Sequence, residues 1–389
     1  MLSSYEKALA SHSFLLLAHY ASFAMQDLLV EYLSKYKVKE VTMFNLPLPE
    51  LPYLHHIQIN TFSKGSKQAS EKIRSFYKPK TLAYILQSVQ IFCIFLFSQK
   101  KYDIVIAQDS LLAFIAIMLR RLGICKVVVF YSHGVDNTRF GSSFMLKIYT
   151  WLDRFCATNS NYNIVLGNKM LPVRKGQGIY MENVFWIPAS IPVDSVARKT
   201  NIKNHKLIFM GTLNNKNGVY LLPDIVIAIK KRIPDVMLDI MGNGDLYGSL
   251  EKRIRELHLE DSIKLFGNVA FKDFAKILTN YACGIVSYEY SKNNLLQMTD
   301  PMKLRVYAAA GLPMVITKGF SFSKEVEQEE LGFAVEYSIE GFANGIIKIL
   351  QNEKLAKKLR SNNLSYSKKY DLDKFYKKAF SRILEDKNL

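Results

Sequence analysis

The chain has 389 residues, of which 49% are hydrophobic and 22% are charged, and a formal net charge of +18. This composition excludes a disordered or fibrous protein, and the length favours two domains over one. The charge excess is spread along the chain, since residues 1–194 carry 21 basic and 12 acidic residues and therefore half of it. Such a surplus attracts nucleic acid, anionic lipid headgroups or phosphorylated ligands, unless it is only a solvated lysine-rich surface.

Cysteine spacing and hydropathy limit the cellular setting. Cys93, Cys125, Cys156 and Cys283 lie far apart, without a CxxC pair or metal-ligand spacing, so we expect unpaired thiols, a reducing compartment and no bound metal. The N-terminus lacks the charged-then-apolar pattern of a signal peptide. The longest apolar run, residues 82–97, is shorter than the about 20 residues that cross a bilayer, and predicts either a core helix or a helix at a membrane surface.

In the first half, short runs rich in β-branched residues alternate with helical patterns such as residues 110–122. This alternation is typical of βα units around a parallel sheet. The runs are almost continuously apolar, as expected of strands that are covered on both faces. The expected strands are residues 13–20, 40–46, 55–62, 102–108, 126–133 and 163–168.

The second half repeats the alternation after a stretch, residues 185–206, that contains two prolines and little periodicity. That composition is typical of a linker. A basic helical tail closes the chain. The expected strands are residues 206–211, 236–242, 262–267, 283–289, 313–317 and 332–337.

We therefore predict an α/β protein with two doubly wound, Rossmann-like domains that face a cleft. The expected boundaries are residues 1–187, a linker at 188–205, a second domain at 206–366, and a C-terminal helix at 367–389 that packs back on the first domain. In such sheets, ligands bind beyond the carboxyl ends of the strands.

Two strand ends of the second half have the residues of a phosphate site. Gly211 is followed by a polar loop that contains Lys216; a glycine lets a phosphate approach the backbone, and a lysine supplies a counter-charge. The alternative is an ordinary strand-to-helix turn. Gly242 lies at the next strand end, but the third glycine of the dinucleotide fingerprint is missing, which excludes a dehydrogenase.

The segment TDPMKLRVYAAAGLPMV, residues 299–315, predicts a helix followed by a strand. Asp300, Pro301 and Gly311 are suitable for the start and end of a purely structural helix. Lys303 is not, because a cation in the first turn opposes the helix dipole. We expect either a bound anion beside Lys303 or a solvated lysine.

The order of these features resembles the nucleotide-binding domain of GT-B glycosyltransferases, especially the large retaining group called family 4. The most specific part is PMKLRVYAAAGLPMVI, preceded in order by MLDIMGNGDL, IKLFGNV and CGIVSYE. Within the family, the chain looks closest to bacterial polysaccharide transferases of the galactofuranosyl- and glucosyltransferase-like subgroup. In the first half, YSHG and VFWIPASIPVD resemble the acceptor-side strand end and the crossover segment.

The resemblance implies roles for individual residues. His133 would face the reacting sugar, Glu289 would hold the donor sugar, and Lys216 would neutralise the departing diphosphate; these three are the catalytic candidates. His133 also has a structural interpretation as a buried strand-end residue. Histidines elsewhere, such as His12 and His19, form no triad or metal set in the sequence. The residues expected to bind the nucleotide are Gly211, Thr212, Lys216, Gly242, Val269 and Lys303.

Two positions depart from the family pattern: Val306 stands where the signature has a glutamate, and Thr212 where many members have an arginine. We still expect a metal-independent hexosyltransferase without a cofactor, with retention favoured over inversion and a UDP-sugar favoured over a GDP-sugar as donor. The alternatives are a non-catalytic GT-B partner subunit and a sugar-nucleotide epimerase of the same fold.

The expected acceptor is a lipid-linked or oligosaccharide precursor of a bacterial surface polysaccharide. The basic surface favours a cytoplasmic protein that is peripheral at the inner face of the cell membrane. Nucleic acid is not an expected partner, since the basic residues do not interleave with exposed aromatic ones. The sequence assigns no oligomeric state.

Overall fold

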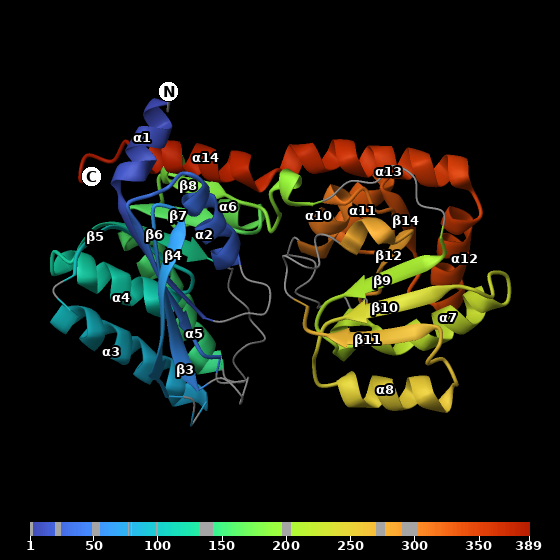
Figure 1. Ribbon diagram of the computed structural model, residues 1–389. Coiled ribbons are helices and arrows are strands. Elements are labelled where there is room, and N and C mark those ends of the chain that lie inside the picture. Colours follow the sequence, from blue (N-terminus) through green and yellow to red (C-terminus); the bar gives the residue numbers. More distant parts are fainter. Residues whose placement is uncertain are drawn as a thin grey trace. The chain divides into compact units, whose positions relative to one another are not determined.

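The computed structural model divides into two compact units (Figure 1). Unit 1 comprises Met1–Pro188 and Asp373–Leu389, and unit 2 comprises Ala189–Leu372. Each is an α/β domain on a largely parallel sheet, which confirms the predicted fold class. The structure describes residues 3–19, 25–48, 55–76, 78, 80–98, 100–132, 143–196, 204–269, 277–289 and 302–389.

The sheet of unit 1 has eight strands in the order β4-β3-β2-β1-β5-β6-β7-β8. Strands β3 and β4 form an antiparallel hairpin at one edge, and the other strand pairs are parallel apart from β2 with β3. The sequence analysis missed β4 and β8, because β4 is polar and exposed and β8 has only three residues. The strands are β1 (Ser13–His19), β2 (Glu40–Leu46), β3 (His56–Ser63), β4 (Ser66–Arg74), β5 (Tyr102–Ala107), β6 (Cys125–Ser132), β7 (Tyr162–Val165) and β8 (Val184–Trp186).

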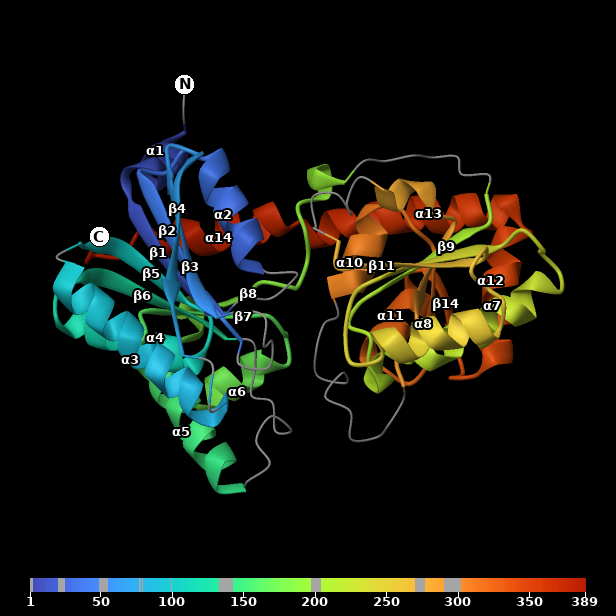
Figure 2. The same cartoon turned by 60° about the horizontal axis from the view of Figure 1, so that its bottom comes forward.

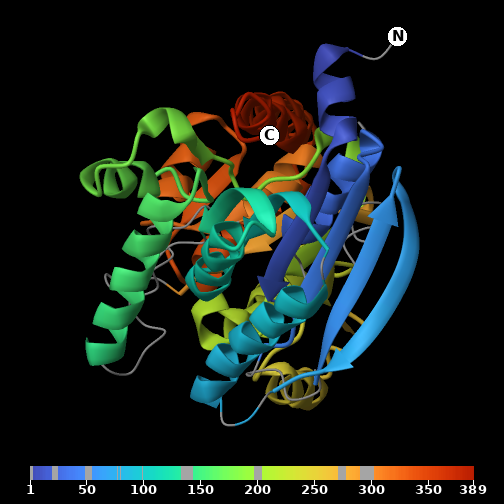
Figure 3. The same ribbon diagram turned by 90° about the vertical axis from the view of Figure 1, so that its left-hand side faces the viewer.

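Helices cover both faces of this sheet (Figures 2 and 3). Helices α3 (Lys80–Ser98), α4 (Ser110–Arg121) and α5 (Ser143–Asn159) pack side by side on one face over an aliphatic core. The other face carries α1 (Ser4–Ser11), α2 (Met25–Lys35) and α14 (Leu372–Ile383). An aromatic cluster joins α2, α14 and β1 there; its members include Phe14, Tyr32, Tyr376 and Phe380. Helix α6 (Met170–Gly176) lies between β7 and β8 in the chain.

The sheet of unit 2 has six parallel strands in the order β11-β10-β9-β12-β13-β14. Helices α7, α8 and α12 pack over one face, and α10 packs on the other, where the Tyr307 ring lies against Gly284. The strands are β9 (Lys206–Met210), β10 (Met237–Met241), β11 (Ile263–Gly267), β12 (Cys283–Val286), β13 (Met314–Thr317) and β14 (Gly332–Val335). The helices are α7 (Leu222–Lys230), α8 (Tyr247–Glu256), α10 (Met302–Ala309), α11 (Ser321–Gln328), α12 (Ile339–Leu350) and α13 (Glu353–Ser367).

Short 3-10 helices link several of these elements: η1 (Met181–Asn183), η2 (Val193–Ser195), η3 (Asn215–Asn217), η4 (Val219–Leu221), η5 (Leu278–Asn280) and η7 (Lys368–Tyr370). Among the described residues, no helix is long and apolar enough to cross a membrane. The four cysteines are free thiols, and Cys93 is exposed whereas the other three are buried.

In each sheet, successive strands are first added toward one edge and then, after one reversal, toward the other edge. In unit 1 the reversal lies between the neighbouring strands β1 and β5, and in unit 2 it lies between β9 and β12. The carboxyl ends of the strands at such a switch point diverge into different loops and leave room for a ligand. These two edges are therefore the places to look for function.

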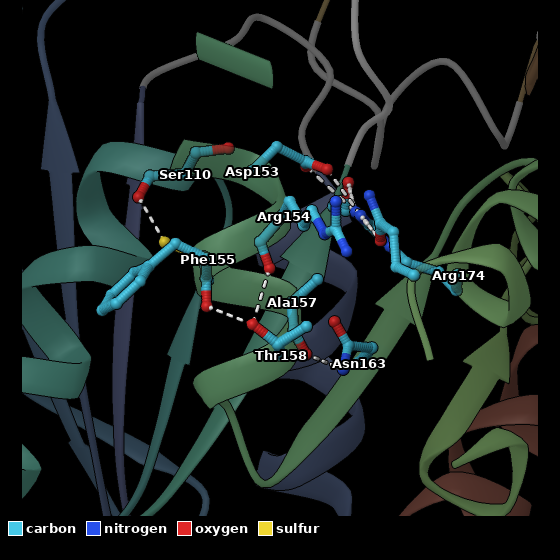
Figure 4. Close-up of polar contacts among 11 residues, drawn as sticks. Ser110, Asp153, Arg154, Phe155, Ala157, Thr158, Asn163 and Arg174 are labelled. Atoms are coloured by element: carbon cyan, nitrogen blue, oxygen red, sulfur yellow. Dashed lines mark hydrogen bonds and ion pairs between the residues drawn. The ribbon is translucent and has the colours of Figure 1, made fainter. Parts of the chain in front are cut away.

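A buried ion pair fixes the helices beside one end of β6 (Figure 4). Arg174 of α6 is fully buried and contacts both carboxylate oxygens of Asp153 on α5, at 2.5 and 3.0 Å. The same guanidinium donates to Ser132 Oγ at 2.8 Å and lies over the Phe130 ring. Arg174 therefore ties α5 and α6 to the last residue of β6.

Replacing Arg174 by methionine is expected to lower the free energy of unfolding by about 3–5 kcal/mol, because Asp153 would keep a buried charge without its partner. Urea denaturation followed by circular dichroism measures the loss. Arg154→Met is the matched control, since Arg154 lies on the exposed side of α5. Adding Asp153→Leu to Arg174→Met should recover part of the stability. Equal effects of Arg174→Met and Arg154→Met would contradict this role.

Candidate functional site

Two loops meet at the switch point of unit 2. One follows β9 and runs from Gly211 through η3, and the other follows β12. The Glu289 backbone N–H donates to the Lys216 carbonyl at 3.0 Å, and Ser287 Oγ donates to the Asn217 carbonyl at 3.0 Å. The structure thus brings Lys216 and Glu289, two of the expected catalytic residues, to one place.

Glycines allow the backbones at this edge to touch. Gly218 has a φ of +62°, and a Cβ there would lie 1.7 Å from the Ser287 carbonyl oxygen. Gly242 has a φ of +145°, and a Cβ there would lie 1.9 Å from the Gly211 carbonyl oxygen. Any larger residue would push these loops apart. The ends of β9, β10 and β12 consequently form one continuous backbone surface.

Lys303, near the start of α10, points its amine into this surface. Its side chain is nearly buried, with 7% of the residue exposed, so the alternative of an ordinary solvated lysine is wrong. The Nζ atom lies 4.4 Å from the centre of the Tyr288 ring and 4.9 Å from that of Phe209, and it donates to Asn217 Oδ1 at 3.4 Å. A Cβ on Gly211 would lie 3.0 Å from the same Nζ.

No ion pair among the described residues includes Lys303. Burial without a carboxylate partner lowers the pKa of Lys303 from 10.5 to about 7, because the charged form loses solvation that nothing replaces. Aromatic faces attract a cation, but more weakly than a carboxylate does. An anion delivered by a ligand would complete this arrangement.

The other expected nucleotide-binding residues lie along the same edge. Thr212 is exposed directly after Gly211. Val269 follows the end of β11, which β10 separates from β9, so it lies further along the edge and is half-buried. Val306 is fully buried in the core. Asp300 and Pro301 lie outside the described residues.

His133 also lies outside the described residues, which end at Ser132 on that side of the chain. Its proposed role therefore stays a prediction. The sequence analysis missed Phe209, Asn217 and Tyr288, which surround the Lys303 amine. No local pattern marks these three residues, since they meet only through the pairing of β9 with β12.

Metal ligands were sought across the part of the chain that the structure describes. There, no group of three or more His, Cys, Asp or Glu side chains is arranged to hold a metal ion.

Comparison with known proteins gives a family for unit 2. Residues 194–365 match the family described as "Glycosyl transferases group 1", so this unit carries a glycosyltransferase group 1 domain. No curated protein matches the chain. Solved structures match both units together.

Among them, HepE of Anabaena in complex with UDP-glucose is 14% identical, with a TM-score of 0.65 over 96% of this chain and 99% of HepE. Sucrose-phosphate synthase from Thermosynechococcus elongatus is 15% identical, with a TM-score of 0.64 over 92% of this chain and 95% of that one. TarM of S. aureus, in complex with UDP, is 16% identical, with a TM-score of 0.57 over 90% of this chain and 68% of TarM. At these identities the likeness shows the fold, and with the matched domain it supports a GT-B glycosyltransferase.

Replacing Lys303 by methionine should stabilise the ligand-free protein below pH 7, by an amount on the order of a few kcal/mol, because it removes a buried, unpaired charge. As the pH rises from about 7 to 10.5, native Lys303 is neutral while the unfolded chain still binds its proton. The wild type therefore gains stability in this interval. The difference in free energy of unfolding between Lys303→Met and the wild type becomes smaller as the pH rises. Urea denaturation across this range tests it. Lys216→Met is the control, since Lys216 is exposed. A stability difference between Lys303→Met and the wild type that does not change with pH would contradict a buried Lys303 charge.

Proposed function

We propose that the chain is a hexosyltransferase that moves a sugar from a nucleotide sugar to a growing, lipid-linked or oligosaccharide precursor of a bacterial surface polysaccharide. The observation that carries the proposal is the buried Lys303 amine, which has no acidic partner among the described residues and lies at the switch point of a glycosyltransferase group 1 domain. A UDP-sugar is the favoured donor, since HepE and TarM were solved with UDP. The nucleotide sugar is a co-substrate, and we propose no further cofactor.

The chemistry follows from where the charge develops. As the bond between the anomeric carbon and the diphosphate breaks, negative charge grows on the diphosphate. Lys303, held in place by its surroundings, and Lys216 are proposed to stabilise this charge, while Gly211 gives the diphosphate room to approach the backbone. Glu289 is proposed to hold the donor sugar and Val269 to contact the base. In this scheme transfer is metal-independent. The family resemblance implies retention at the anomeric carbon, with the departing diphosphate taking the acceptor's proton.

A second candidate function is a non-catalytic partner that only binds nucleotide. The observation in its favour is Val306, which is buried in the core where the family signature has an acid. The exposed Thr212, which stands in place of an arginine, also favours a non-catalytic partner. The two candidates differ in whether this chain turns over a donor.

UDP should raise the melting temperature of the wild type more than GDP, CMP or dTDP does, because a ligand that binds only the folded state stabilises it. Lys303→Met and Lys216→Met should each weaken UDP binding about tenfold or more, as expected for the loss of a charge-assisted contact. Isothermal titration measures the affinities, and Lys357→Met, on the exposed face of α13, is the control.

Release of UDP from UDP-sugars in the presence of an acceptor then separates the two candidate functions. Binding without turnover would support the partner role, and a converted sugar nucleotide would indicate an epimerase. Unchanged UDP affinity in both lysine variants would contradict the proposed site.

We also propose that unit 1 binds an anionic membrane surface. Helices α3 and α5 lie on the same face of the unit 1 sheet (Figure 3). Large hydrophobic side chains are exposed along one side of α3 and along α5, whereas only two are exposed among the described residues of unit 2. Exposed large hydrophobic side chains gathered on neighbouring helices favour an interaction site. This apolar surface comprises Leu82, Ile85, Val89, Leu96 and Phe97 of α3 and Phe144, Met145, Ile148 and Trp151 of α5.

The charges near this surface suit anionic lipid. Helix α3 contains no acidic residue, and the one acid of α5, Asp153, is buried against Arg174. Lys147 and Arg154 are exposed on α5 beside the apolar side chains. Basic residues next to inserted apolar ones are typical of helices that lie in a membrane interface.

The double variant Ile85→Glu, Trp151→Glu should bind anionic vesicles at least about tenfold more weakly, because two apolar side chains lose their burial in lipid. Flotation with phosphatidylserine-containing vesicles at low salt measures binding. Phe266→Glu, an exposed aromatic residue of unit 2, is the control. Absence of wild-type binding would reject the membrane and leave a protein as the partner of this surface.

A further inference from the structure

The Lys303 amine is held in place by neutral groups from the ends of two neighbouring strands. A lysine side chain is long and flexible, so an amine that is to meet a ligand at a fixed point needs contacts that hold it. The Phe209 and Tyr288 rings provide two faces, and Asn217 Oδ1 provides a hydrogen-bond acceptor at 3.4 Å from Nζ. A Cβ on Gly211 would lie 3.0 Å from Nζ and 3.9 Å from Asn217 Oδ1. The amine and its acceptor therefore meet at the carboxyl end of β9.

Asn217 is itself fixed at each of its hydrogen-bonding groups. Its Nδ2 donates to the Thr212 carbonyl at 2.8 Å and to Asn214 Oδ1 at 3.0 Å. Its backbone N–H donates to the same Asn214 oxygen at 3.0 Å, and its carbonyl accepts from Ser287 Oγ at 3.0 Å. Because the Nδ2 group is committed to these two acceptors, the orientation of the amide is determined, and Oδ1 is the atom that faces Lys303.

The Tyr288 ring is fixed by two further rings. Phe320 and Phe322 follow β13, and each packs edge-to-face with Tyr288 at a distance of 5.9 Å between ring centres. The two phenylalanine rings stack on each other at 5.1 Å, and all three residues are almost fully buried. Aromatic pairs of this geometry attract each other beyond the effect of the area that they bury. The face that Tyr288 presents to Lys303 is therefore set by packing within unit 2.

The other buried cation of α10 has a different kind of partner. Arg305, with 4% of its side chain exposed, lies 3.6 Å from the centre of the Tyr370 ring. Its Nη1 and Nη2 atoms each lie 3.4 Å from a carboxylate oxygen of Glu325. A carboxylate neutralises a buried cation, whereas a ring face or an amide oxygen compensates its charge only weakly. On one helix, unit 2 thus supplies an acid for Arg305 and, among the described residues, an amide for Lys303.

We infer that Asn217 and Tyr288 are positioning residues that hold the Lys303 amine toward the diphosphate of the donor and leave its charge to pair with that ligand. This inference rests on the proposed nucleotide-sugar binding at the same site. Both residues act through Lys303 and need not touch the donor. An acid at position 217 would hold the amine equally well, but it would neutralise the charge before a ligand arrives. Asn217 therefore makes the amine available to an external anion.

Two substitutions of Asn217 separate position from charge. Asn217→Ser and Asn217→Asp both lose the Nδ2 donors, and only Asn217→Asp adds a carboxylate next to Lys303. The affinity for UDP should fall about twofold to tenfold in Asn217→Ser, as expected for the loss of a neutral hydrogen bond. It should fall at least about tenfold further in Asn217→Asp, because the carboxylate competes with the diphosphate. Asn352→Asp, at the N-cap of α13, is the matched control, since aspartate caps a helix as well as asparagine does.

Proton uptake on binding distinguishes this role from a purely structural one. At pH 8.5, above the pKa of about 7 to which burial lowers Lys303, UDP should bind together with nearly one proton. Asn217→Ser should keep this uptake, and Asn217→Asp should lose it, because its carboxylate has already raised the pKa of Lys303. Isothermal titration in buffers of different ionisation enthalpy measures the uptake. The titratable residues described in the elements around the amine are Tyr288 and Glu289 after β12, Lys216 after β9, and Arg305 and Tyr307 of α10.

The ring face is tested separately. Tyr288→Leu removes the ring and should weaken UDP binding about threefold to thirtyfold, the usual effect of a cation–π contact. Tyr288→Phe, which keeps the ring, should restore most of the affinity. Melting temperatures show whether the variants are folded, and if Tyr288→Leu does not fold, the two Asn217 variants decide the question.

The outcomes separate this inference from the proposed function. A wild type that binds UDP, with equal affinity and equal proton uptake in Asn217→Ser and Asn217→Asp, would overturn the inference and leave the proposed function intact. A wild type that binds no UDP would overturn the proposed function and this inference with it.

Discussion

A lysine amine that is buried with no acidic partner in the described part of the chain is the constraint around which unit 2 is arranged. Removing an ammonium from water is costly unless other groups replace the solvent. Here the rings of Phe209 and Tyr288 and the Asn217 amide do so only in part, and the pKa of Lys303 stays lowered. The glycines at the ends of β9 and β10 bring backbone close to the same point. A fold selected only for stability would place an apolar side chain there, so the energetic cost points to an anionic ligand.

The corresponding edge of unit 1 has a different chemistry. There, the half-buried His19 contacts the Asp109 carboxylate, and next to the end of β6 the buried Arg174 donates to Asp153 and Ser132. The Arg174 charge is fully compensated and is therefore unsuited to recruit a phosphate. The His19 Nε2 atom is buried and has no hydrogen-bond partner among the described residues.

The sequence predicts the parts of this molecule that depend on local pattern. Parallel strands covered on both faces are apolar throughout, so most strands of both sheets were located within a few residues. The polar strand β4 has no such pattern, since it lies at the sheet edge with its side chains in solvent. Lys303 was predicted because its charge opposes its helix end. His19 and Asp109 are 90 residues apart in the chain, and only the pairing of β1 with β5 brings them together. The position of His133 lies outside the described residues, and its role stays a prediction.

The departure at Val306 bears directly on the anion site. Residues 303 and 306 are one turn apart on α10 and share a face of that helix. An acid at position 306 would therefore lie within reach of the Lys303 amine and supply a carboxylate that the described residues do not provide. With valine there, fully buried, none of the described ion pairs satisfies Lys303. In the proposed function a diphosphate would be the counterion that restores the charge of Lys303, and its binding would be coupled to proton uptake above pH 7. The absence of a glutamate at position 306 thus makes Lys303 more dependent on an anionic ligand. This dependence favours a site that has kept nucleotide binding over one that has lost it.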